Sequence, residues 1–124
     1  MPNTPTGLKY AKSDEWFDET TGKVGISDYA QDQLSDIVFL EIRVSAGDKV
    51  EAGSIIASVE SVKAASDVLA PASGQVVAVN NAVTSNPENL NSDPYGSWFI
   101  QLEGSAAAGL LDADTYDRHC AERH

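Results

Sequence analysis

Residues 54–69 read SIIASVESVKAASDVL and contain two strand-like stretches that flank a single lysine. Residues 54–60 alternate with the two-residue period of a β-strand, and residues 66–69 resume an extended pattern beyond the lysine. The pattern therefore predicts a β-hairpin with Lys63 at its tip. A hairpin tip keeps an amine clear of the core, because the two strands fix its position.

Lys63 is also isolated in charge. It is the only basic residue between Lys49 and Arg118, and the same stretch carries nine acids: Glu51, Glu60, Asp67, Glu88, Asp93, Glu103, Asp112, Asp114 and Asp117. Small neighbours such as Ala64 and Ala65 leave room for another protein to reach and modify the amine. A solvated turn lysine is the commoner outcome, so spacing alone leaves both interpretations open.

Short strands and tight turns also dominate the chain outside this hairpin. A turn at residues 19–22 predicts a first hairpin, and residues 36–42 predict a strand with Val38, Leu40 and Ile42 on one face. Two more strands are expected, at residues 75–79 and 98–102. Many short strands, Gly- and Pro-containing turns and few helices predict a mainly β fold, a small barrel or sandwich.

Three helical segments are expected beside the strands. A cap at residue 27 or 28 predicts a short first helix, and Asn86 followed by proline predicts a single helical turn. Alanine and leucine enrichment, with Asp112 as a cap, predicts a C-terminal helical segment over about residues 105–122. Tyr116 and Cys120 are four positions apart and are expected to share its inward face.

The size and charge of the chain limit its functions. Its 124 residues predict a single domain over 1–124, with the core at about 8–103 and no room for a second sizeable core. The formal net charge is −11, from 8 Lys and Arg against 19 Asp and Glu. This excess of acid repels phosphate backbones, which argues against nucleic acid as a partner and favours basic proteins.

Cysteine and histidine usage gives no catalytic or metal motif. Cys120 is the only cysteine, which excludes an internal disulfide and favours a reducing compartment. His119 lies beside it, but adjacent residues on a helix point in different directions, so the two make no catalytic dyad. Neither His119 nor His124 has metal-ligand spacing, and no CxxC or HExxH motif is present, so we expect no metal.

Targeting signals are also not evident in the sequence. No apolar run approaches the roughly 20 residues of a membrane span. The N-terminus lacks the apolar core of a signal peptide and is too poor in arginine for a transit peptide. We expect a cytoplasmic bacterial protein, without membrane contact, that acts as a monomer. A mature mitochondrial protein without its presequence would have the same features.

A resemblance to a known family covers the chain from about residue 8 to residue 116. The run VESVKAASDV (59–68), followed by APASGQV (70–76), resembles the lipoylation signature of the glycine cleavage system H protein family. Separate segments continue the resemblance in the family's order: residues 9–16, 24–31, 34–39 and 91–98.

The resemblance implies a fold and a function. The implied fold is a lipoyl-type hybrid barrel-sandwich of two small antiparallel sheets with short helices and a C-terminal helix. The implied cofactor is lipoate, joined to Lys63 by an amide, on a non-catalytic carrier that shuttles the aminomethyl group of glycine. The implied partners are a lipoylating enzyme, a pyridoxal-phosphate (PLP)-dependent glycine decarboxylase, a tetrahydrofolate-dependent aminomethyltransferase and a flavin-containing dihydrolipoyl dehydrogenase. The cofactor holds the reactive sulfurs, and the protein presents them.

The resemblance also implies roles for residues near the lysine. The loaded arm would fold into a cleft on the carrier in which Ser13, Glu15 and Asp67 face its amine. A carboxylate that pairs with a protonated amine in a drier site would protect it from water. From the residues alone, each acid is more commonly a surface charge. Recognition by the lipoylating enzyme is implied for four neighbours of the lysine: Glu60, Ser61, Val62 and Ala64. For Glu60 a structural role is an equal alternative.

One departure from the family pattern lies next to these cleft residues. Asp14 stands where the family usually carries a histidine. A role for an imidazole near the lipoyl arm is therefore not expected in this chain. The run around Lys63 is unaffected.

Other classes of protein are compatible with parts of this sequence. Biotin carriers place methionine on both sides of their lysine, where this chain has Val62 and Ala64, and lipoyl domains of 2-oxoacid dehydrogenases typically have an acid before it. An H-like protein that passes lipoate to other complexes stays open, since its carrier surface would be the same. An enzyme that uses Glu15 and Asp67 as an acid pair lacks an activating base, phosphate loop or metal cluster. An unmodified acidic module that binds basic proteins is a third class.

Overall fold

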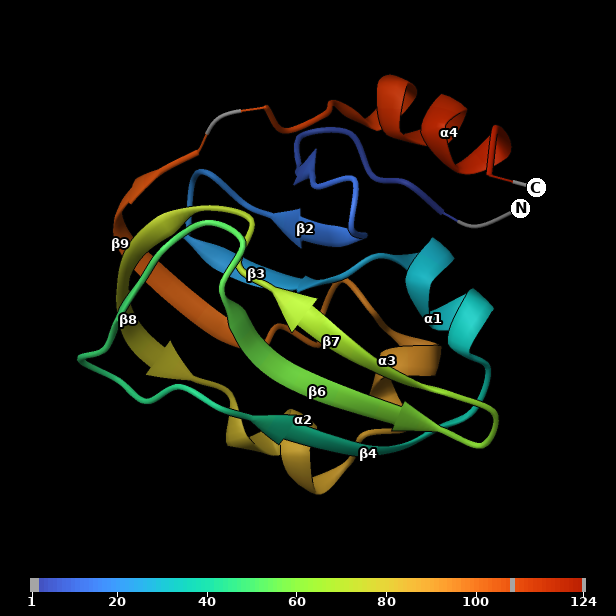
Figure 1. The fold of residues 1–124 in the computed structure, drawn as a ribbon, viewed down its shortest axis with the longest axis horizontal. Coiled ribbons are helices and arrows are strands. Elements are labelled where there is room, and N and C mark those ends of the chain that lie inside the picture. The colour runs from blue at the N-terminus through green and yellow to red at the C-terminus, as the bar shows by residue number, and fades with distance from the viewer. Residues whose placement is uncertain (1–2, 108, 124) are drawn as a thin grey trace.

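Two antiparallel β-sheets form the body of the protein in a computed structural model that describes residues 3–107 and 109–123 (Figure 1). The larger sheet contains, in spatial order, β1 (Lys9–Tyr10), β2 (Glu15–Phe17), β3 (Lys23–Ile26), β9 (Ile100–Ala106), β8 (Ser73–Val79) and β5 (Lys49–Val50). The smaller sheet contains β4 (Ile37–Ile42), β6 (Ile55–Ser61) and β7 (Ala65–Leu69).

The core lies between the inner faces of the two sheets. Val24, Val76 and Ile100 of the larger sheet and Ile56 and Val59 of the smaller sheet have no exposed surface. Burying a side chain of this size stabilises the fold by about 1.5–3 kcal/mol. The alternating patterns in the sequence thus place apolar side chains on the inner face of each sheet.

The predicted lysine hairpin is present. Strands β6 and β7 pair antiparallel, with Glu60 opposite Ala65 and Ser58 opposite Asp67. Lys63 lies in the turn that joins them. The closed end of this hairpin lies at the same end of the molecule as helix α1 (Asp28–Leu34) in Figure 1.

The first hairpin and the first helix are also confirmed. Strands β2 and β3 pair antiparallel around the predicted turn. Ser27, rather than Asp28, is the N-cap of α1, since its hydroxyl accepts a hydrogen bond from the backbone N–H of Ala30 at 3.1 Å. A serine cap satisfies one of the amide groups that a helix start leaves without a partner.

Strand β4 differs from the predicted alternation. A register shift between Ile37 and Phe39 places two consecutive side chains outward, with Val38 57% and Phe39 48% exposed, while Ile37 and Leu40 are buried. The prediction that Val38 shares a face with Leu40 was therefore wrong. A β-bulge adds one residue to one strand of a pair, which a strict two-residue period does not anticipate.

Two short helices lie between β8 and β9. Helix α2 (Asn81–Ser85) was not predicted, and Asn86 is its C-cap rather than the start of a helix. The predicted turn of helix, expected to begin at Pro87, begins two residues later, as α3 (Asn89–Ser92). Such short helices depend on packing more than on their own sequence, which explains why local signals misplaced them.

Helix α4 (Ala113–Ala121) packs on the outer strands β1 and β2. Asp112 caps it as expected and accepts a hydrogen bond from the N–H of Thr115 at 2.8 Å. The helix starts later than residue 105, because β9 continues to Ala106. Tyr116 and Cys120 are buried as predicted, and the Tyr116 ring stacks on Tyr10 with centroids 4.7 Å apart. None of the helices within the described ranges is long and apolar enough to cross a membrane.

Candidate functional site

The turn that carries Lys63 is tightly organised by Ser61. The Ser61 hydroxyl accepts hydrogen bonds from the N–H groups of Ala64 at 3.1 Å and Lys63 at 3.3 Å, and the Ser61 N–H donates to the Ala64 carbonyl at 2.8 Å. The N–H of Val62 donates to the carbonyl of Asp36 at 3.0 Å, which ties the turn to the segment before β4. The backbone under the lysine is thus fixed on both sides.

The side chain of Lys63 on this fixed backbone is open to solvent. Lys63, Ala64 and Ala65 are exposed, and Val62 is 68% exposed. Among residues 3–107 and 109–123, the Lys63 ammonium group has no hydrogen-bond or ion-pair partner. The amine is therefore accessible to a modifying active site, with small or apolar side chains around it.

A cleft of about 300 Å³ brings together Ser13, Glu15 and Asp67, the three residues predicted to share one. Ser13 lies in the turn before β2, Glu15 is the first residue of β2, and Asp67 comes from β7. Apolar side chains, including Leu34 and Val59, line the same cleft. The cleft thus combines an apolar lining with carboxylates, and it borders the strand that leads directly from the lysine turn.

Glu15 is the most unusual group in the cleft. It is 1% exposed, and its carboxyl accepts hydrogen bonds from the Ser13 hydroxyl and from the backbone N–H of Leu69, the latter at 3.0 Å. Burial raises the pKa of the Glu15 carboxyl to about 7, although these two hydrogen bonds lower it in part. Near neutral pH the group can therefore exist with or without its proton.

Asp14, which lies between Ser13 and Glu15, pairs with the C-terminal helix region. The Arg123 guanidinium donates to both Asp14 carboxylate oxygens, to Oδ2 at 2.9 Å, and the Tyr116 hydroxyl donates to Oδ1 at 2.9 Å. The hydrogen bonds from Arg123 to Asp14 raise the pKa of the guanidinium further above its ordinary value. Asp14 and Arg123 both line the cleft.

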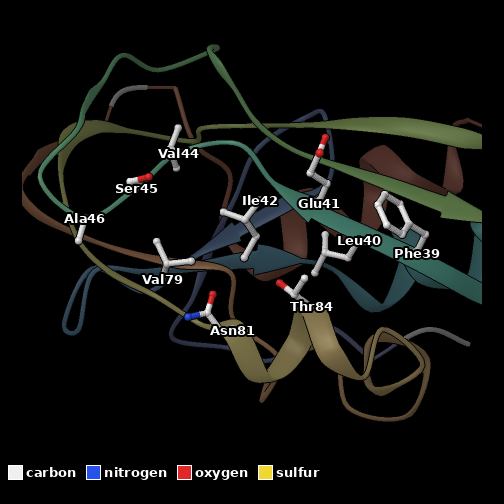
Figure 2. Close-up of a pocket in the computed structure, with 10 residues that line it drawn as sticks. All are labelled: Phe39, Leu40, Glu41, Ile42, Val44, Ser45, Ala46, Val79, Asn81 and Thr84. Carbon is white, nitrogen blue, oxygen red and sulfur yellow. The ribbon is translucent and has the colours of Figure 1, made fainter.

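A larger groove lies elsewhere and lacks the cluster of charged side chains that lines the cleft. It has a volume of about 580 Å³ and runs between β4, the segment after it and α2, where Asn81 and Thr84 project from the helix (Figure 2). It has no lining residue in common with the cleft. Glu41 is the one charged group among its described lining residues and lies 3.4 Å from Arg43. Volume alone therefore does not identify the functional site.

Metal and thiol chemistry find no support in the described residues. Within residues 3–107 and 109–123, no group of three His, Cys, Asp or Glu side chains could hold a metal ion. Burial raises the pKa of the Cys120 thiol, which disfavours the reactive thiolate. His119 contacts the carbonyl of Lys12 at 3.2 Å instead of a catalytic partner.

The residues predicted to guide recognition by the lipoylating enzyme lie at or near the hairpin tip rather than in the cleft. Ser61 organises the turn, while Val62 and Ala64 are exposed beside the lysine. Glu60 is exposed and lies opposite Phe39 of β4. Sequence reasoning missed two contributors to the cleft. The Leu69 amide is a backbone group without a sequence signal, and Arg123 lies far along the chain from Asp14.

Comparison with known proteins places the chain in a family. A family model described as glycine cleavage H-protein matches residues 8–123. The chain belongs to the glycine cleavage H-protein family. The family prediction made from the lysine run and the other resembling segments is thereby confirmed.

Individual H proteins agree with this assignment over nearly their whole length. A glycine cleavage system H protein of Deinococcus deserti is 53% identical over 116 residues, or 92% of this chain and 95% of that protein. A probable glycine cleavage system H protein of Thermoplasma volcanium is 42% identical over 118 residues, or 94% and 96%. A crystal structure of the Mycobacterium marinum H protein superposes with a TM-score of 0.88 at 36% identity, covering 94% of this chain and 98% of that chain. The predicted barrel-sandwich of two antiparallel sheets is thus confirmed.

Proposed function

We propose that this H-family protein carries lipoate on Lys63 and shuttles the aminomethyl group of glycine within the glycine cleavage system. The observation that carries the proposal is the exposed Lys63 amine, without a partner among the described residues, on a turn fixed by Ser61. An amine in this setting can form an amide with an activated acyl group without disturbing the core.

The surroundings of the amine fit a lipoyl group. Exposed Val62, Ala64 and Ala65 leave space for the active site of a lipoylating enzyme and offer no competing charge. The cleft beside β7 combines apolar side chains, which suit a hydrocarbon arm, with carboxylates that suit a protonated amine. A carrier needs the exposed lysine turn to present the lipoyl group to enzymes and the cleft to shield the bound aminomethyl group from water.

The chain contributes positioning and electrostatics rather than bond-making. When bound, lipoate supplies the sulfur that carries the aminomethyl group. Glu15 and Asp67 would accept hydrogen bonds from the amine of this load, and Ser13 would hold the Glu15 carboxyl in place. Apolar lining residues such as Leu34 and Val59 would exclude water, which strengthens these interactions.

The proposed role requires a specific set of partners. A lipoylating enzyme would modify Lys63 once. A PLP-dependent decarboxylase would then supply the aminomethyl group, a tetrahydrofolate-dependent aminomethyltransferase would remove it, and a dihydrolipoyl dehydrogenase would reoxidise the dithiol. The protein would act as a monomeric, non-catalytic carrier among them.

Reconstitution with the three glycine-cleaving enzymes tests this proposal. The lipoylated wild-type chain is expected to support glycine-dependent release of carbon dioxide and ammonia. Lys63→Arg keeps the positive charge but cannot be lipoylated in the normal way, so it is expected to support none. Lys49→Arg, a matched change on β5, should behave as wild type. Full activity with Lys63→Arg would refute the assignment.

A further inference from the structure

Asp14 adopts a backbone conformation that residues with a side chain rarely adopt. Its φ is 85°, in the left-handed region, where a Cβ is strained although aspartate is tolerated better than most residues. Such a conformation persists only when surrounding contacts determine it. Because Asp14 lies between Ser13 and Glu15, its contacts also fix how the chain passes through these two cleft residues.

Backbone hydrogen bonds hold part of this turn. The N–H of Asp14 donates to the carbonyl of Ala11 at 2.9 Å, and the N–H of Ser27 donates to the carbonyl of Asp14 at 2.9 Å. These bonds position the main chain but do not satisfy the carboxylate. That side chain is only 15% exposed and therefore needs protein partners.

The partners come from the C-terminal helix region. Arg123 reaches both carboxylate oxygens of Asp14, and its guanidinium lies over the Tyr29 ring at 4.8 Å from the centroid. The Tyr116 hydroxyl adds a third hydrogen bond to the same carboxylate. A two-point contact of this kind fixes the orientation of a carboxylate as well as compensating its charge.

We propose that Arg123 is a positioning residue of the cleft. It holds the turn at residues 13–15, so that the side chains of Ser13 and Glu15 keep their positions in the cleft. The turn ends at Glu15, whose carboxyl is bonded to the N–H of Leu69 on β7. Movement of Asp14 would therefore be transmitted to this link between the two sheets. The role of this contact in retaining the aminomethyl group rests on the proposed function, whereas its effect on the geometry of the turn can be tested without lipoate.

The aspartate at position 14 is essential to this arrangement. A neutral histidine has one acceptor nitrogen and could not receive two N–H groups from a guanidinium. The contact between Asp14 and Arg123 connects the C-terminal helix region to the cleft through two hydrogen bonds, which a histidine at position 14 could not accept.

Hydrogen exchange in the unmodified full chain tests the proposal. Arg123→Gln is expected to accelerate exchange of the Leu69 amide by about fivefold relative to wild type, since contacting residues in one network are coupled. Arg123→Lys, which keeps the charge but loses the planar two-point contact, should fall in between. Arg118→Gln removes the same charge from an exposed position on α4 and should match wild type. Equal Leu69 exchange in Arg123→Gln and Arg118→Gln would overturn the proposal.

A second variant separates positioning from general stability. Asp14→Asn should accelerate Leu69 exchange as Arg123→Gln does, and the double variant should add little, because both changes remove one interaction. A lower thermal midpoint with exchange accelerated equally at all core amides would indicate a purely structural role and would overturn the proposal.

Lipoylated protein gives an independent functional readout. Arg123→Gln should be lipoylated on Lys63 to the wild-type extent, as measured by intact mass, yet lose a bound aminomethyl group about fivefold faster. A wild-type rate of loss would overturn the positioning role. Failure of wild-type Lys63 to accept lipoate would instead refute the proposed function, while the exchange measurement would still decide the role of Arg123.

Discussion

The carboxyl group of Glu15 accepts a hydrogen bond from the backbone amide of Leu69 at 3.0 Å and thereby joins β2 of the larger sheet to β7 of the smaller one. The Ser13 hydroxyl donates to the other carboxyl oxygen. The side chain that would receive a carried amine is therefore also a structural link. Stability and load retention can be measured separately at this one position.

Stability should depend on pH through Glu15. Its pKa is about 7 in the folded chain against 4.5 as the ordinary value, so the folded state holds a proton that the unfolded state has lost between these limits. The free energy of unfolding contributed by this group is fully present below pH 4.5, decreases as pH rises to about 7 and is absent above. The shift corresponds to about 3 kcal/mol in total.

Glu15→Gln isolates this contribution from those of the other carboxyl groups. Urea unfolding of both proteins across this pH range should give a difference that changes steeply between pH 4.5 and 7 and is flat above. Parallel profiles for wild type and variant would contradict the raised pKa of Glu15.

Asp67→Asn should affect the retention of a bound aminomethyl group but not the stability of the protein. Asp67 is exposed on β7, so the free energy of unfolding should change by less than about 0.5 kcal/mol. Lipoylation should proceed normally, and loss of a bound aminomethyl group should accelerate about tenfold, as expected for one lost charge-assisted hydrogen bond. Glu103→Gln, an exposed acid on β9, is the matched control. The same rate of loss in both variants would exclude Asp67 from the cleft function.

Much of the fold follows from local pattern, and the parts that did not follow are set by tertiary contacts. The hairpin around Lys63 and the Ser27 cap depend on short-range periodicity and capping, which a sequence displays directly. The bulge at Phe39 and the late start of α3 depend on how neighbouring strands pair and pack. No local signal encodes those interactions.

The candidate site divides in the same way. Lys63 was singled out by its isolation in charge, whereas Ser13, Glu15 and Asp67 were assigned to one cleft by family resemblance rather than by spacing. The two contributors that were missed act through a backbone amide, at Leu69, and through a contact across 109 positions, between Arg123 and Asp14. Both arise only once the chain has folded.

Ser61→Ala should loosen the lysine turn. It removes an oxygen that accepts two backbone hydrogen bonds, so unfolding should become easier by about 1 kcal/mol and the amides of Lys63 and Ala64 should exchange faster. The rate of lipoylation should fall several-fold, because the amine is less well presented. Ser105→Ala on β9 provides the control. Wild-type exchange at these two amides would show that the hydroxyl does not organise the turn.

Tyr116→Phe should weaken the attachment of α4 without disturbing its packing. The hydroxyl is hydrogen-bonded to Ser27 at 2.6 Å and to Asp14 at 2.9 Å, while the ring stacks on Tyr10. Its removal should lower the free energy of unfolding by about 1–3 kcal/mol, since buried polar groups lose their partner. Denaturant unfolding measures this change directly. An unchanged midpoint would mean that the hydroxyl network contributes nothing to stability.

Intact mass and peptide mapping after incubation with a lipoylating enzyme and lipoate are the decisive test of Lys63 as the residue that accepts lipoate. Attachment at Lys63 predicts a single lipoyl adduct on the peptide that contains Lys63 in the wild-type chain, and an unmodified mass for Lys63→Arg. An adduct on a different residue, or a wild-type chain that stays unmodified beside a control H protein that is lipoylated, would contradict it.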